Sequence, residues 1–490
     1  MRIAAKAVPT PFAIPGPALS RIEHYGAAGL GAAELGLAEE ERMNEHIFRE
    51  YDIRGVVGQD LTDATVYTLA RALGSFYIGH GARRIGVGRD ARESSPRFRD
   101  LLASGLAESG CAVLDVGMVP TPALYFTLFE KNVDGGVMIT GSHNPANNNG
   151  FKICLGKSTI FGDQISQIKE IAESGQFVNG SGTIEESDVV APYADYIASG
   201  IALGPRPLKV VVDAGNGMGG FIGAPLYRRI GCAVIELFCE PDSRFPNHHP
   251  DPTVPENMRF AIDAVRENRA DLAIAFDGDA DRIGVVDETG KIIWGDQLMV
   301  LFSREILKQR PGATIIGEVK CSQTLFDDIA AHGGNPIMWK VGHSLIKAKM
   351  KEEDAVLAGE MSGHLFFADR YFGYDDAIYA GARLLEILSH ASRPLSSLLF
   401  DLPPLASTPE IRIDCADDRK FAVVRELTQK FKQTHKVIDI DGARILFEKG
   451  WGLIRASNTQ PVLVARFEAI DEDALRDIQA TVEGEMRRLI

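Results

Sequence analysis

Three aspartates on alternate residues, Asp277, Asp279 and Asp281, have the clearest chemical meaning in this sequence. They directly follow the apolar run 272–276, which predicts a buried strand. Open α/β sheets bind ligands beyond the carboxyl ends of their strands, so a site is expected here. Clustered carboxylates repel one another unless a cation neutralises them, and hard oxygen ligands favour Mg²⁺, Ca²⁺ or Mn²⁺. The segment therefore predicts a hard-metal site.

A calcium-binding helix–loop–helix motif is the alternative interpretation of this acidic segment. Counted from Asp277, Glu288 falls at position 12 as that motif requires, but Arg282 replaces the glycine of position 6. The flanking segments 283–286 and 291–294 have the pattern of two strands in a hairpin. We therefore reject the calcium loop. A guanidinium beside the carboxylates indicates a phosphate ligand instead.

Ser142 lies in a second candidate segment, 140–145, which follows the apolar run 137–139. A serine in a tight loop of Gly, Asn and Pro is exposed, as a nucleophile or phosphate carrier must be. A serine hydrolase is the competing interpretation. However, the sequence Gly-x-Ser-x-Gly is absent, and His143 is poorly placed as a triad base because it is adjacent to the serine. A metal beside Ser142 suits phosphoryl transfer rather than acyl transfer.

The composition is that of an acidic globular protein with several domains. Its 490 residues exceed one ordinary core, and 45% hydrophobic and 24% charged residues are ordinary values. A net charge of −15 argues against a nucleic-acid or acidic-membrane binder. The 6 cysteines lack disulfide-like spacing, and no stretch approaches the ~18 apolar residues of a membrane helix. We expect a cytoplasmic protein without nucleic-acid or membrane partners.

The first 43 residues differ from the rest in being rich in Ala, Gly and Pro. Their prolines interrupt any apolar core of a signal peptide. We expect a disordered or weakly helical extension over residues 1–43, and Met43 is an alternative start.

The remaining chain alternates strand-like runs with helical segments, which predicts α/β units with mixed or parallel sheets. The expected strands end in loops that contain Gly or Asp, and they lie at 85–87, 137–139, 210–212, 272–276 and 314–316. The expected helices lie at 62–77, 96–109, 258–267 and 297–309.

A smaller α+β domain is expected after the Leu-Pro-Pro segment 402–404. Its strands are predicted near 410–413, 443–448 and 462–468. The closing segment predicts an amphipathic helix whose apolar face holds Leu475, Ile478, Val482 and Leu489.

Four motifs together resemble the α-D-phosphohexomutase superfamily, and most closely its bacterial phosphomannomutase/phosphoglucomutase branch. They are TGSHNP around Ser142, DGDADR at 277–282, GEMSGH at 359–364 and RASNT at 455–459. The resemblance extends from about Phe48 to the C-terminus. It implies three similar mixed-sheet α/β domains and a C-terminal α+β domain around a central cleft. We place these domains at 44–188, 189–291, 292–403 and 404–490.

The resemblance implies an isomerase of carbohydrate metabolism that transfers a phosphoryl group reversibly between C1 and C6 of mannose or glucose phosphates. A phosphoserine enzyme, Mg²⁺ and a hexose 1,6-bisphosphate, as intermediate and activator, would take part. A monomer acting on hexose phosphates is expected. The alternatives are a catalytically silent phosphosugar-binding protein and a phosphoglucosamine mutase. Met361 argues against the latter, because the glucosamine branch usually has Gln there.

The resemblance also assigns residues to the phosphoryl-transfer centre. Ser142 would carry the phosphoryl group, and its phosphate would join Asp277, Asp279 and Asp281 in holding Mg²⁺. The moving group would be surrounded by His143, Lys152 and Arg282. Either Lys152 or His143 would be the base that accepts the sugar hydroxyl proton.

The remaining assignments concern the substrate. Sugar hydroxyls would be recognised by the loop Glu360, Met361, Ser362, Gly363 and His364. The phosphate that is not reacting would be held by a loop of the C-terminal domain, Arg455, Ala456, Ser457, Asn458 and Thr459. Further substrate-binding positions match Tyr51, Arg54, Lys320 and His343.

Three other segments are expected to be structural. Arg89 and Arg92 are predicted to make ion pairs that hold the first domain rather than to guide phosphates. The paired His248 and His249 lack a further spaced metal ligand. The glycine-rich segment 213–220 lacks the Gly-Lys-Ser/Thr ending of a phosphate loop and predicts a turn.

Overall fold

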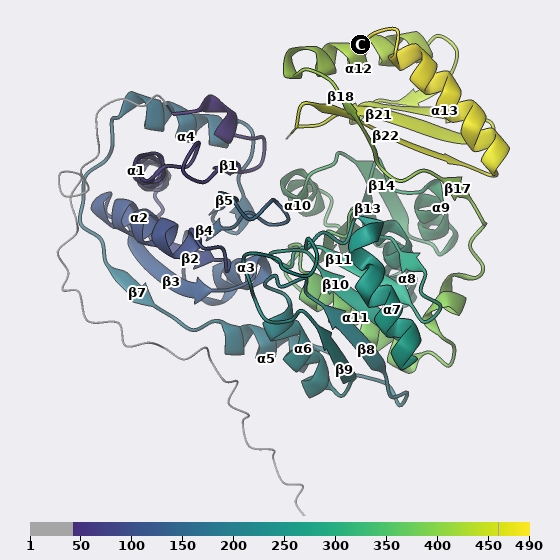
Figure 1. The fold of residues 1–490 in the computed structure, drawn as a ribbon, viewed down its shortest axis with the longest axis horizontal. Helices are drawn as coiled ribbons and strands as arrows, with labels where there is room; N and C mark the ends of the chain where they lie inside the picture. Colours follow the sequence, from purple (N-terminus) through teal and green to yellow (C-terminus); the bar gives the residue numbers. More distant parts are fainter. Residues whose placement is uncertain (1–42, 459) are drawn as a thin grey trace, which may run out of the picture. The chain divides into compact units, whose positions relative to one another are not determined.

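Four β-sheets organise the part of the chain that the computed structural model describes, residues 43–458 and 460–490 (Figure 1). The predicted extension, apart from Met43, lies outside the described residues, and so does Thr459. None of the helices within the described ranges is long and apolar enough to cross a membrane.

The first sheet has the strand order β1-β5-β4-β2-β3-β7, with β6 paired to β5. Strands β4, β2, β3 and β7 run parallel, whereas β5 is antiparallel to β4 and to β1. Its strands are β1 (Ile53–Val56), β2 (Arg84–Arg89), β3 (Ala112–Met118), β4 (Gly135–Ile139), β5 (Asn148–Leu155), β6 (Ser158–Thr159) and β7 (Ile184–Glu186). The associated helices are η1 (Glu45–Ile47), α1 (Asp63–Gly79), α2 (Ser95–Glu108), α3 (Thr121–Glu130) and α4 (Asp163–Ser174).

Parallel pairing of β2 with β4 decides where the serine loop lies. Arg89 at the end of β2 pairs with Ile139 at the end of β4. Because both strands end at the same edge of the sheet, the loop after β2 lies beside the loop that carries Ser142.

The second sheet has the order β12-β11-β10-β8-β9. The hairpin of β11 (Ile283–Asp287) and β12 (Ile292–Ile293) confirms the prediction that excluded a calcium loop. The buried strand predicted at 272–276 is β10 (Leu272–Phe276). The other elements are α5 (Val190–Gly200), β8 (Lys209–Asp213), α6 (Gly220–Ile230), β9 (Ala233–Leu237), η2 (Pro255–Met258) and α7 (Arg259–Asn268).

The third sheet has the order β14-β13-β15-β16, in which β16 is antiparallel to β15 and the other neighbours are parallel. Its strands are β13 (Thr314–Glu318), β14 (Asn335–Trp339), β15 (Leu357–Gly359) and β16 (Leu365–Phe367). Its helices are α8 (Gly295–Gln309), α9 (Gln323–Ala331), α10 (His343–Glu352), α11 (Ala377–His390) and η3 (Leu395–Leu399).

The fourth sheet has the order β17-β22-β21-β20-β19, with β18 also paired to β22, and all of its pairs are antiparallel. Helices α12 and α13 pack against this sheet in a shared apolar core (Figure 1). The elements are β17 (Ala406–Ser407), β18 (Ile411–Asp414), α12 (Asp417–Phe431), β19 (Lys436–Ile438), β20 (Ala443–Phe447), β21 (Gly450–Ala456), β22 (Val462–Ala469) and α13 (Glu472–Met486).

The architecture confirms three mixed-sheet α/β units followed by an α+β unit, whereas the boundaries placed between them stay predictions. Two details differ from expectation. Leu489 lies beyond the end of α13, so it packs at the edge of the core rather than on the helix face. Arg455 and Ala456 belong to β21, because the strand ladder with β22 extends through both residues.

Candidate phosphoryl-transfer site

The three aspartates lie in the turn that connects β10 to β11, and none of their side chains is exposed to solvent. Asp277 closes the turn, because its Oδ1 accepts the backbone N–H groups of Asp281 and Arg282 at 3.1 and 3.2 Å. Ala280 has φ 62°, an uncommon conformation for a residue other than glycine. The result is one carboxylate oxygen from each aspartate within 4.8 Å of the others.

The surroundings shift the pKa values of Asp277 and Asp279 in opposite directions. Burial, followed by repulsion from Asp281 and Asp279, raises the pKa of Asp277 well above its usual range. Burial also acts to raise the pKa of Asp279, but Lys152 and other hydrogen-bond donors outweigh it and hold that pKa low. The Lys152 ammonium lies 2.6 Å from Asp279 Oδ2 and also binds Asp281. Despite its burial, these carboxylates raise the pKa of Lys152 above its usual value.

Ser142 contacts this cluster, although it lies in the loop after β4 of the first sheet and the aspartates follow β10 of the second sheet. Its Oγ is 3.0 Å from Asp277 Oδ2 and 3.1 Å from His143 Nδ1. The loops can approach so closely because residue 278 is glycine: a Cβ there would come within 2.2 Å of the Ser142 carbonyl oxygen. Ser142 itself adopts φ 47° and is 3% exposed, so the prediction that it is exposed is wrong: the aspartate turn packs over its loop. Burial and then the cations Arg282 and Arg54 hold the pKa of His143 well below its usual value, so the imidazole is neutral.

The aspartate cluster fits a hard divalent cation. Asp279 Oδ1 and Asp281 Oδ1 are buried without a hydrogen-bond partner among the described residues. Unpaired carboxylate oxygens are costly in a protein interior, and a cation removes that cost. An all-oxygen donor set suits Mg²⁺, Mn²⁺ or Ca²⁺. The geometry therefore supports a metal site formed by Asp277, Asp279 and Asp281.

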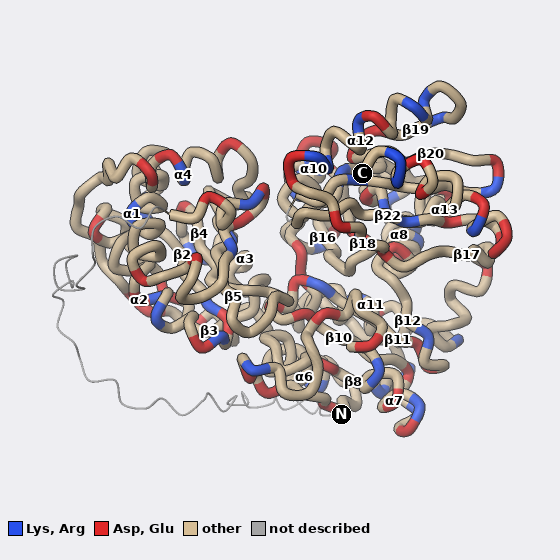
Figure 2. Tube along the Cα trace, turned by 45° about the horizontal axis from the view of Figure 1, so that its top comes forward, with Lys and Arg blue, Asp and Glu red and all other residues tan. Residues whose placement is uncertain are grey.

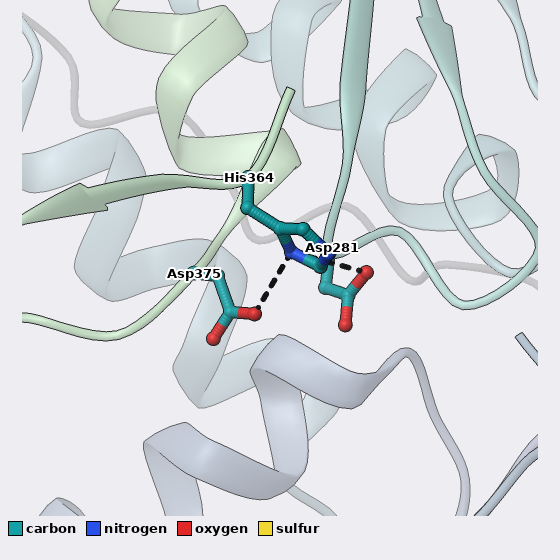
Figure 3. Close-up of side chains that lie close together, drawn as sticks. All are labelled: Asp281, His364 and Asp375. Atoms are coloured by element: carbon teal, nitrogen blue, oxygen red, sulfur yellow. Dashed lines mark ion pairs between the residues drawn. The ribbon is translucent and has the colours of Figure 1, made fainter. Parts of the chain in front are cut away.

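A second group of three side chains, Asp281, His364 and Asp375, shares Asp281 with this cluster (Figure 3). His364 Nε2 accepts a hydrogen bond from Arg282 Nε at 2.9 Å, so the ring proton belongs on Nδ1. This atom lies 3.0 Å from Asp375 Oδ2 and 3.6 Å from Asp281 Oδ1. Lys347 lies 3.0 Å from Asp375 Oδ1.

Glu360 is positioned by its own loop and by a neighbouring helix. Its Oε1 accepts the Gly342 N–H at 2.7 Å, just before α10, and its Oε2 accepts the Ser362 hydroxyl at 2.9 Å. Burial acts to raise the pKa of Glu360, but His364, Lys320 and these hydrogen bonds outweigh it and lower that pKa. Glu360 is therefore an ionised acceptor. Met361 and Gly363 connect the loop to α8 and β11 through backbone hydrogen bonds, with Gly295 N and Ile283 N as the donors.

Four further predicted residues lie in a network that joins the first, third and fourth sheets: Tyr51, His343, Arg455 and Asn458. The Tyr51 hydroxyl donates to the Val341 carbonyl at 3.1 Å and accepts from Asn458 Nδ2 at 2.7 Å. The Tyr51 ring packs edge-on against His343. Arg455 Nε donates to Asp441 Oδ2 at 3.0 Å, and Asp441 also accepts Val341 N.

Two predicted cations are paired with carboxylates, Arg54 within its own turn and Lys320 with a residue just before β18 of the fourth sheet. Arg54 binds Asp52 at 2.7 Å in the turn before β1, and Lys320 binds Glu410 at 3.0 Å. Ala456 and Ser457 are buried at the end of β21. Thr459 lies outside the described residues.

Several contacting residues were not predicted. Thr121 donates both its N–H and its hydroxyl to Asp279, but no pattern around Thr121 signals this. Asp375 lies in an acidic pair after Gly373, a signal that was available in the sequence. His249, expected to be purely structural, contacts the His143 carbonyl through Nε2.

Basic and acidic residues are interspersed along the described elements (Figure 2). Positive charge at the site therefore comes from individual residues. The main contributors are Lys152, Lys320 and Arg455, which are buried, and Arg282, which is partly buried.

Comparison with known proteins agrees with this geometry. Family models for phosphoglucomutase/phosphomannomutase match domain I at residues 45–179, domain II at 191–290, domain III at 294–405 and the C-terminal domain at 410–485. A phosphomannomutase/phosphoglucomutase of Pseudomonas aeruginosa is 47% identical over 454 residues, which is 92% of this chain and 98% of the relative. A phosphoglucomutase of Neisseria gonorrhoeae is 47% identical over 442 residues, 89% of this chain and 96% of the relative.

A crystal structure of a phosphoglucomutase/phosphomannomutase family protein from Burkholderia thailandensis superposes with a TM-score of 0.85 at 43% identity. It covers 91% of this chain and 98% of that protein. The fold and the buried carboxylates beside a serine agree with an α/β enzyme that transfers phosphoryl groups. The chain belongs to the phosphoglucomutase/phosphomannomutase family of the α-D-phosphohexomutase superfamily, which confirms the resemblance of its motifs.

Proposed function

We propose that this chain transfers a phosphoryl group reversibly between C1 and C6 of hexose phosphates, through a phosphoserine at Ser142 and a hexose 1,6-bisphosphate. One observation carries the proposal: Ser142 Oγ lies 3.0 Å from Asp277 Oδ2, in a buried cluster of hard oxygen ligands. A hydroxyl at a metal site is the arrangement that phosphoryl transfer requires. The names of the relatives from Pseudomonas aeruginosa and Neisseria gonorrhoeae support the same activity.

The metal would be held by Asp277, Asp279 and Asp281 together with a phosphate oxygen on Ser142. When bound, Mg²⁺ supplies positive charge that offsets the charge of the moving phosphoryl group. Arg282 and Lys152 add fixed positive charge on the protein side. Proton exchange with the sugar hydroxyl falls to His143 or Lys152, which both lie at the serine–aspartate cluster.

Substrate recognition is assigned to residues away from the metal. Glu360, an ionised acceptor with both oxygens oriented, would bind adjacent sugar hydroxyls. Arg455, Ser457, Asn458 and Thr459 would hold the phosphate that is not reacting. Two separate recognition regions allow the bisphosphate to reorient, so that either of its ends can face Ser142.

The test combines covalent chemistry with a rate measurement. Protein incubated with glucose 1,6-bisphosphate should carry one phosphate on the peptide containing Ser142, and Ser142→Ala should carry none. A coupled assay with glucose 1-phosphate and mannose 1-phosphate, with and without the bisphosphate, should show turnover that a chelator abolishes and Mg²⁺ restores. Absence of both the phosphopeptide and the turnover would refute the proposal. Binding of hexose phosphates without turnover would indicate the silent binding protein instead.

A further inference from the structure

Arg92 lies at the centre of the loop that carries Ser142. It follows β2 and is 2% exposed, so its guanidinium is removed from solvent. An arginine has five N–H donors in a fixed planar fork, and burial requires each of them to find an acceptor. The identity of those acceptors shows what the side chain does.

All five donors of Arg92 have an acceptor, and four of the acceptors are backbone carbonyls: three in the serine loop between β4 and β5, and one at Asn148, the first residue of β5. Nη2 donates to Ser142 O at 2.8 Å and Asn144 O at 2.6 Å. Nη1 donates to Pro145 O at 2.6 Å and Asn148 O at 2.8 Å. Nε donates to Asp90 Oδ2 at 3.2 Å. The guanidinium therefore occupies the interior of the loop and connects its two sides.

Asp90, which directly follows β2, binds both Arg92 and the serine loop, and we call this arrangement of Arg92 and Asp90 the clamp. Its Oδ2 also accepts the Gly141 N–H at 3.1 Å, and its Oδ1 accepts the Ser95 hydroxyl at 2.6 Å. The contact with Arg92 is so close that a Cβ on Gly141 would come within 2.4 Å of the guanidinium carbon. The ion pair predicted for Arg92 is present, but it orients the guanidinium toward the serine loop.

The backbone of Ser142 needs such a constraint. Its φ of 47° is uncommon for a residue with a side chain, and surrounding structure must impose it. The Ser142 carbonyl is held by Arg92 on one side and faces Gly278 on the other. A change in the orientation of this peptide would move Oγ away from Asp277.

We propose that Arg92 is a positioning residue for phosphoryl transfer, which holds the Ser142 backbone so that Oγ faces the aspartate cluster. It acts through the loop, and none of its five donors contacts the aspartate cluster. The proposal deepens the proposed function and rests on it for the kinetic part of its test. Phe245, whose ring lies 5.5 Å from the guanidinium carbon, covers the clamp from the segment after β9.

Arg92→Met and Arg92→Lys test this role. Met keeps the length and apolar part of the side chain without donors, and Lys offers three donors from a point rather than a fork. A displacement near 1 Å lowers rates about 100-fold, so we expect kcat of Arg92→Met to fall by about that factor. KM should stay within about threefold, because substrate contacts are retained. Arg92→Lys should give an intermediate kcat.

Arg383→Met is the matched control. Arg383 is also buried, at 3% exposure, and donates to the Asp369 carbonyl and carboxylate from α11. A comparable loss of thermal stability is expected in this variant with kcat close to that of the unsubstituted protein. The comparison separates loss of positioning from loss of a buried arginine in general.

Amide hydrogen exchange of residues 141–148 gives a readout that needs no activity. Exchange in this segment should accelerate in Arg92→Met and not in Arg383→Met. The proposal would be overturned if Arg92→Met showed unchanged amide exchange, a kcat within about threefold of the unsubstituted protein, or a rise in KM alone. If Arg92→Met does not fold, Arg92→Lys decides by the same criteria. An unsubstituted protein without mutase activity would overturn the proposed function, whereas the exchange data would still decide whether Arg92 holds the loop.

Discussion

Glu360 is a buried carboxylate whose two oxygens are both oriented by hydrogen bonds. The Gly342 N–H and the Ser362 hydroxyl each occupy one lone pair, so both oxygens keep acceptor capacity. His364 and Lys320 counteract the effect of burial and keep the pKa low, so the group stays ionised at neutral pH. Ionised acceptors make stronger hydrogen bonds than neutral ones.

We predict that Glu360→Gln lowers kcat/KM for every hexose phosphate that the protein accepts. Hydrogen bonds to charged groups contribute about 1.5–3 kcal/mol, which corresponds to a loss of about 10- to 100-fold. Steady-state kinetics with glucose and mannose 1-phosphates check this. The exposed Glu256→Gln serves as control. If Glu360→Gln had the same kinetics as the control, Glu360 would not take part in binding the sugar.

At the scale of elements, helix α11 begins at a buried carboxylate that three donors surround. Asp376 is the N-cap residue and accepts Tyr379 N at 2.8 Å, and it also accepts the hydroxyls of Tyr193 at 2.9 Å and Tyr371 at 2.7 Å. Tyr193 belongs to α5, so the cap connects two helices far apart in sequence. Burial outweighs these hydrogen bonds and raises the pKa of Asp376 to about 6.

This raised pKa predicts a specific pH dependence of stability. The folded protein binds the proton more tightly than the unfolded chain, so the contribution is complete below about pH 4 and is lost as pH rises through about 6. The change is about 3 kcal/mol over that range. We predict that Asp376→Asn flattens the decline of the unfolding temperature between these pH values, measured by calorimetry. Asp471→Asn, which changes the exposed N-cap of α13, should leave the decline in place. An unchanged decline in Asp376→Asn would contradict the assignment.

For the whole molecule, the informative contacts are those that join one sheet to another. The Tyr51 hydroxyl, before the first sheet, contacts Val341 after β14 of the third sheet and Asn458 after β21 of the fourth. One phenol therefore connects three parts of the chain that the sequence separates by 290 and 407 residues. Burial raises the pKa of this phenol, so it stays protonated and can donate.

We predict that Tyr51→Phe raises KM for hexose phosphates by about 5- to 30-fold and leaves kcat less affected. The expected cost is that of one or two hydrogen bonds, about 1 kcal/mol each. The ring contact with His343 is retained, so only the connection through the hydroxyl is lost. Tyr67→Phe is the matched control, because the Tyr67 hydroxyl binds Glu108 between α1 and α2. Equal KM values for both variants would show that the connection does not contribute to substrate binding.

The sequence by itself determined several of the strands and the motifs, because both consist of short segments. The alternation of apolar runs with Asp, Gly and Ser loops identified β10 and the aspartate turn, and it placed Ser142 in a loop after β4. Turn chemistry and hydrophobic periodicity are local properties, so they can be recognised without neighbours in space. The same locality explains why Arg455 and Ala456 were predicted in a loop: the ladder that extends β21 is formed with a partner strand.

Only the tertiary structure decided which of these segments meet. Ser142 and Asp277 are 135 residues apart, and their contact depends on how two sheets pack and on the missing side chain of Gly278. The five acceptors of Arg92 lie in Asp90 after β2, in the loop after β4 and in the first residue of β5, so the arginine that was expected to make a simple ion pair also holds the serine loop. Long-range packing selects one set of neighbours from many compatible ones, and a local pattern does not contain that choice.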